Sequence, residues 1–205
     1  VFAVSPYTPA RTACRSVPLD EAREAFLASH RPLLFTYFAY RPEYTLDVLF
    51  DARAGFAAGA PGFGLVAVDD RSFPDDAVMS RAQGAIAGSA LAGAVLLTGH
   101  VDRGTFLTLL ARCDLFVRTP ATDGVCSSVL EALSLGVPVV AAANACRPAA
   151  VVAYEPGSAA DLRAKLAQSV ARLDDLRREV RSAPVAAEDG AEKLAALVEE
   201  RCLAR

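Results

Sequence analysis

Short apolar runs alternate with helix-forming segments along the chain, and this alternation constrains the fold more than any other feature. The runs are apolar throughout, as expected for parallel strands that are covered on both faces. The runs predicted as strands are 33–38, 63–68, 95–98, 114–117, 137–141 and a more weakly marked 150–154. Helices are predicted over 19–29, 43–58, 75–92, 103–112, 128–135, 159–182 and 189–203. The alternation predicts an α/β fold, with a doubly wound, mostly parallel, Rossmann-like sheet in a three-layer α/β/α arrangement.

Proline-rich breaks set the predicted domain boundaries. Residues 1–30 are predicted as a linker and a lead-in helix, 31–182 as the Rossmann-like domain, and 183–205 as a C-terminal tail helix. The chain starts at Val1 and shows no signal-peptide pattern, so we interpret it as a processed chain or a piece of a longer one.

The composition excludes several classes of protein. With 21 basic and 24 acidic residues there is no basic footprint for nucleic acid, and no apolar run is long enough for a transmembrane helix. Two histidines and five cysteines without a C-x-x-C pair argue against a metal centre or a disulfide framework. The cysteines are therefore expected to be buried or half-buried thiols in a reducing compartment: Cys14, Cys113, Cys126, Cys146 and Cys202. We expect a cytoplasmic protein, and peripheral membrane association of a full-length form stays open.

The segment 114–140 carries most of the chemistry. Its strand delivers Arg118 to the carboxyl end of the sheet, where ligands bind in doubly wound folds. A helix begins near Ser127 and Ser128, and its free amides and positive dipole end would form an anion site. Gly136 is suited to the left-handed conformation that ends such a helix.

The loop within this segment contains acceptors for sugar hydroxyls. Gly124 lets a ligand approach the backbone, while Asp123 and Glu131 can accept hydrogen bonds. Structural alternatives exist for each: Asp123 and Gly124 could form an ordinary turn, Ser128 and Glu131 a capping box, and Arg118 a surface ion pair.

An acidic residue, Asp123, then seven residues, then Glu131-Ala-Leu-x-x-Gly-x-Pro-Val-Val resembles the donor-site motif of retaining nucleotide-sugar glycosyltransferases. These are the group 1, family 4-like enzymes with GT-B architecture, and the motif belongs to the C-terminal one of their two Rossmann-like domains. The arrangement agrees over 30–182, and the motif is specific over 114–140. The resemblance is greatest to a subgroup of polysaccharide biosynthesis. It implies that the acceptor-binding N-terminal domain is missing and that this chain alone is inactive.

The resemblance also implies a site for a UDP-, GDP- or ADP-sugar as substrate, with no metal and no other cofactor. In that site Glu131 would accept from the ribose hydroxyls, and Asp123 would act as a catalytic residue facing the donor sugar. The other implied donor-binding residues are Gly124 and Cys126 at the sugar, Ser127, Ser128 and Val129 at the diphosphate, and Gly99, His100 and Val101 at the base.

One family motif is absent. The Arg-x-x-x-x-Lys-Gly that follows the first strand in relatives is replaced at its defined positions by Ala39, Tyr44 and Thr45. Arg41, as a catalytic residue, or Arg118 is expected to supply part of the missing phosphate charge. Two alternatives therefore stay open: a non-catalytic nucleotide- or sugar-binding module, and half of a nucleotide-sugar epimerase.

Overall fold

One parallel sheet organises the molecule. The structure is a computed structural model that describes residues 16–57, 62–87, 91–124, 126–183, 195–196 and 199–200. The strands are β1 (Leu33–Ala39), β2 (Gly64–Asp70), β3 (Val95–Leu97), β4 (Leu115–Arg118), β5 (Val139–Ala142) and β6 (Val152–Tyr154). They lie in the order β3-β2-β1-β4-β5-β6, and neighbouring strands are parallel. This order confirms the doubly wound sheet and reverses direction between β1 and β4.

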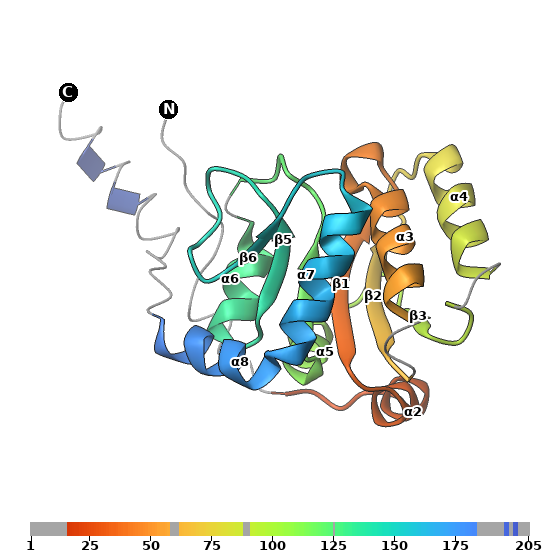
Figure 1. Cartoon of the computed structure of the whole chain (residues 1–205), viewed down its shortest axis with the longest axis horizontal. Helices are drawn as coiled ribbons and strands as arrows, with labels where there is room; N and C mark the ends of the chain where they lie inside the picture. The colour runs from red at the N-terminus through yellow and green to blue at the C-terminus, as the bar shows by residue number, and fades with distance from the viewer. Residues whose placement is uncertain are drawn as a thin grey trace.

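Helices cover both faces of the sheet (Figure 1). One core contains buried side chains of α3 (Leu46–Ala57), α4 (Asp76–Ala87) and α7 (Ala159–Ala171). The other contains side chains of α2 (Glu21–Ser29), α5 (Arg103–Arg112), α6 (Ser127–Ser134) and α8 (Leu173–Ser182). The predicted three-layer α/β/α arrangement is therefore confirmed.

The central strand shows why the strands are apolar throughout. β1 pairs with β2 on one side and with β4 on the other. Leu34 and Phe38 pack into the first core, whereas Leu33 and Phe35 pack into the second. Since both faces are buried, Leu33, Leu34 and Phe35 are all apolar, and the buried hydroxyl of Thr36 donates to the carbonyl oxygen of Val117 at 3.0 Å.

Two predicted helices are interrupted. The helix expected over 43–58 is a 3-10 turn, η1 (Pro42–Tyr44), followed by α3, because Thr45 adopts a left-handed conformation with φ 43°. The helix expected over 159–182 divides into α7 and α8 at Arg172. α7 packs in the first core and Val180 of α8 in the second, so the chain bends around the end of the sheet to reach its other face.

The structure also tests the predictions for Gly136 and for three of the cysteines. Gly136 follows α6 with φ 74°, which confirms its left-handed role. The prediction of buried or half-buried thiols holds for Cys113 and Cys126 but is wrong for Cys146, which is exposed. The N-terminal arm up to residue 15 and most of the predicted tail helix 189–203 lie outside the described residues. In the described part of the chain, every helix is too short or too polar to cross a membrane.

Candidate functional site

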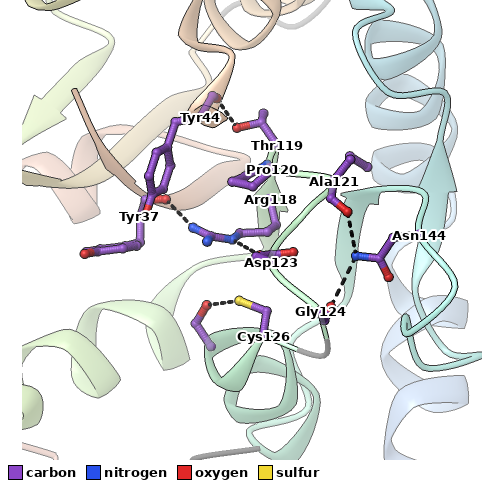
Figure 2. Close-up of polar contacts among 12 residues, drawn as sticks. Tyr37, Tyr44, Arg118, Thr119, Pro120, Ala121, Asp123, Gly124, Cys126 and Asn144 are labelled. Carbon is purple, nitrogen blue, oxygen red and sulfur yellow. Dashed lines mark hydrogen bonds and ion pairs between the residues drawn. The ribbon is translucent and has the colours of Figure 1, made fainter. Parts of the chain in front are cut away.

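The site lies where the strand order reverses. At the carboxyl ends of β1 and β4, the Nη1 of Arg118 donates a hydrogen bond of 2.9 Å to the carbonyl oxygen of Tyr37 (Figure 2). The rings of Tyr37 and Tyr44 stand beside the guanidinium, with their centroids 5.8 and 5.1 Å from its Cζ. Arg118 therefore occupies the crevice in which doubly wound folds bind their ligands.

Tyr37 does not neutralise this cation. Burial, the neighbouring Tyr44 and the carboxylate of Asp70 raise the pKa of Tyr37 to about 12. Its hydroxyl is therefore protonated at neutral pH and lies 3.3 Å from Oδ2 of Asp70, to which it donates.

Asp123 joins two buried arginines. Its Oδ2 accepts from Nε of Arg118 at 2.8 Å, and its Oδ1 accepts from Nη2 of Arg147 at 2.7 Å. The side chains of Arg118, Arg147 and Asp123 are only 6%, 4% and 16% exposed. The alternative of a surface ion pair is therefore wrong. Because two guanidinium groups pair with one carboxylate, this cluster carries an excess of one positive charge beneath the loop that follows β4.

The loop over 119–124 is fixed from below by two residues that follow β5. Arg147 donates to the carbonyl oxygens of Pro120 and Ala142, at 2.6 and 3.1 Å. Asn144 donates to those of Ala121 and Gly124, both at 3.2 Å (Figure 2). Neither residue is predicted from the sequence.

Gly124 is open on the side where a side chain would project. Its φ is 60°, and a Cβ added there would meet no atom of the described residues within 4 Å. A ligand could therefore approach the backbone from this side, and its contact with Gly124 stays a prediction.

Among the described residues, only some of the backbone amides at the amino end of α6 have a hydrogen-bond acceptor. Cys126 caps the helix without a side-chain hydrogen bond, and its Sγ lies 3.1 Å from Oγ of Ser128. The amide of Val129 donates to the Cys126 carbonyl at 3.1 Å, so it is less available to a diphosphate than predicted. Within the described residues, the amides of Ser127 and Ser128 have no acceptor. These two donors, at the positive end of the helix dipole, can bind an anion.

Glu131 lies one turn further along α6 and is nearly buried. Its Oε1 accepts from Nη2 of Arg103 at 2.8 Å, with the two side chains 5% and 42% exposed. The capping box with Ser128 is therefore not formed, because Cys126 caps the helix and the carboxylate faces α5. Arg103 was not identified from the sequence.

The loop after β3 lies at the same edge of the sheet. Gly99 has φ 66°, and its amide donates to Oδ1 of the buried Asp69 at 2.7 Å. His100 is exposed, and Val101 packs partly against the second core. This amide is therefore engaged by Asp69, and His100 is the exposed member of the three residues predicted to line the base pocket.

Arg41 follows β1, and its carbonyl oxygen accepts from the amide of Tyr44 at 3.1 Å. It is exposed and lines a groove of about 440 Å³ between α3 and α4, together with Thr45 and Arg81. Over the residues that the structure describes, no hydrogen bond or ion pair joins the Arg41 guanidinium to Asp123 or to α6. The structure thus joins Arg118 to Asp123 by an ion pair, and a catalytic role of Arg41 stays a prediction.

Comparisons with known proteins identify the family and the fold. The family described as "Glycosyl transferases group 1" matches residues 20–182. No curated protein matches the chain.

Solved structures share the fold at low identity. The C-terminal domain of LpcC, a group 1 glycosyl transferase from Francisella tularensis, is 14% identical with a TM-score of 0.68, covering 91% of this chain and 96% of that domain. HepE from Anabaena, in complex with UDP, is 15% identical with a TM-score of 0.71, covering 95% and 56%. A glycosyltransferase from Rickettsia africae is 15% identical with a TM-score of 0.69, covering 85% and 48%. This chain thus spans about half the length of the last two proteins.

The family match covers most of the chain, and the isolated C-terminal domain of LpcC aligns over nearly its whole length. The chain therefore belongs to group 1 of the glycosyl transferases and has the fold of the C-terminal domain of these GT-B proteins.

Proposed function

We propose that this chain is the donor-binding half of a retaining glycosyltransferase that uses a UDP-, GDP- or ADP-sugar, in polysaccharide or glycoconjugate biosynthesis. One observation carries the proposal: the open amides of Ser127 and Ser128 lie one helical turn from the nearly buried carboxylate of Glu131. A diphosphate fits the amides, and the ribose hydroxyls fit the carboxylate. The complex of the similar HepE with UDP supports this assignment.

The leaving diphosphate needs positive charge. When the bond between the anomeric carbon and the phosphate oxygen breaks, negative charge develops on the diphosphate, and preorganised donors stabilise it. The helix dipole and the excess charge of Arg118, Arg147 and Asp123 would supply this stabilisation without a metal. We propose that this buried charge replaces the lysine that the family has where this chain has Tyr44.

Arg118 has a group free for this role. Its Nε and Nη1 are bonded to Asp123 and to Tyr37. Its Nη2 has no hydrogen-bond partner among the described residues. This nitrogen is not fully buried and therefore contacts solvent. Nη2 can therefore donate to a phosphate oxygen in the crevice.

Asp123 has less freedom than the family glutamate. Both of its oxygens already accept from guanidinium groups, and its side chain is one methylene shorter. We propose that Asp123 accepts from a donor-sugar hydroxyl through a remaining lone pair. The acceptor substrate and further catalytic groups would belong to an N-terminal domain, since the Anabaena and Rickettsia proteins are about twice as long as the aligned part.

Release of the nucleoside diphosphate tests the proposal. The full-length protein, incubated with each nucleotide-sugar and an acceptor mixture, is expected to release the diphosphate, whereas residues 1–205 alone bind the donor without release. Binding without release by the full-length protein would indicate a non-catalytic module. A changed sugar that stays attached to the nucleotide would indicate an epimerase.

A further inference from the structure

Arg103 contacts the carboxylate on which the proposed nucleotide site depends. Its Nη2 donates to Oε1 of Glu131 at 2.8 Å, from the first residue of α5 to the middle of α6. The carboxylate side chain is 5% exposed, so without this partner it would be a nearly buried, unpaired charge. The Arg103 side chain is 42% exposed and therefore lies at the surface rather than inside the core.

Only one of the two carboxylate oxygens is used. Oε2 of Glu131 accepts no hydrogen bond from the described residues, and it is not fully buried. It therefore keeps contact with solvent. A guanidinium on Oε1 leaves Oε2 free to accept from a ligand hydroxyl and removes rotational freedom from the carboxylate.

The attachment point of Arg103 is itself rigid. Asp102 caps α5, accepting from the amide of Thr105 at 3.1 Å and from its hydroxyl at 2.6 Å. The cap fixes the first turn of α5 directly after the loop that holds Gly99 and His100. The guanidinium thus reaches Glu131 from the capped first turn of the helix that follows this loop.

From this geometry we infer that Arg103 is a positioning residue for nucleotide binding, which orients Glu131 so that Oε2 accepts from the ribose hydroxyls. This inference rests on the proposed function. It differs from a role as a latch, in which Arg103 would occupy the carboxylate and compete with the nucleotide. In the positioning role, the carboxylate is already ordered before the nucleotide arrives, so less freedom is lost on binding.

The test compares ribose discrimination between variants. The uridine, guanosine or adenosine diphosphate that binds most tightly, and its 2′,3′-dideoxy form, are titrated into residues 1–205 by calorimetry. In the wild-type protein the dideoxy form is expected to bind more weakly. In Arg103→Met the ratio of the two dissociation constants should fall about two- to tenfold, the range expected when a side chain must be immobilised on binding. Arg103→Lys should restore part of the ratio.

Arg112→Met is the matched control. Arg112 lies at the opposite end of α5, and its substitution removes an ion pair of 2.6 Å with Glu24 whose two side chains are exposed to solvent. Its ratio should equal that of the wild-type protein. An unchanged ratio in Arg103→Met, or tighter nucleotide binding by that variant, overturns the inference while leaving the proposed function intact. If no diphosphate binds the wild-type protein, the proposed function itself fails.

Discussion

Replacing Asp123 with alanine is expected to destabilise the domain by about 3–5 kcal/mol, the usual effect of removing one partner from a buried ion pair. The variant leaves Arg118 and Arg147, which are 6% and 4% exposed, without their shared carboxylate. The two like charges would then repel each other beneath the loop that Arg147 also supports. Urea unfolding, followed by circular dichroism, gives the change in the free energy of unfolding.

A matched control is Asp174→Ala, which removes an exposed carboxylate 3.7 Å from Arg177 on α8. Its effect should stay within about 0.5 kcal/mol, as is usual for surface positions. The account of the buried cluster is wrong if Asp123→Ala is no more destabilising than this control. Asp123→Asn keeps the shape of the side chain and should fall between the two.

Glu131→Ala is expected to weaken binding of the nucleoside diphosphate about 10–100-fold, because a hydrogen bond to a charged group contributes about 1.5–3 kcal/mol. The carboxylate is the only acidic group on α6, and its Oε2 is available to the ribose. Calorimetric titration of the wild-type protein and of the variant gives the two dissociation constants.

Two further variants sharpen this result. Glu131→Gln keeps one acceptor oxygen without the charge, so its affinity should be intermediate. Glu179→Ala removes an exposed glutamate of α8 that pairs with Arg172. This variant should bind the nucleotide as the wild-type protein does. Equal affinity in Glu131→Ala and Glu179→Ala would exclude Glu131 from the nucleotide site.

The sequence predicts the fold well, for a physical reason. Strands of a parallel sheet covered on both faces must be apolar throughout, so β1 and β2 are evident from their residues alone. The break between α7 and α8 at Arg172 is less evident, because the residues on both sides of it favour a helix. The bend depends on the packing of Val180 into the second core, which is a tertiary contact. The left-handed Thr45 is likewise a residue that rarely adopts this conformation.

The site is predicted less completely. Local spacing identifies Ser127, Ser128 and Glu131, because they lie on one helix. It does not identify Arg103 or Arg147, which are separated from their carboxylate partners by 28 and 24 residues. The sequence does contain a signal: a carboxylate among the apolar residues of α6 needs a cation once it is buried. The sequence is rich in arginine, however, and only the tertiary fold determines that Arg103 is the arginine that pairs with Glu131.

The most direct measurement of the central claim is a titration of ¹⁵N-labelled protein with a nucleoside diphosphate and with the matching nucleoside, followed by amide chemical shifts. The amide resonances of Ser127 and Ser128 should move with the diphosphate and move much less with the nucleoside, since these amides lack an acceptor among the described residues. If those two resonances stay unchanged while the diphosphate shifts residues of the groove between α3 and α4, such as Thr45 and Arg81, the diphosphate does not bind at the start of α6.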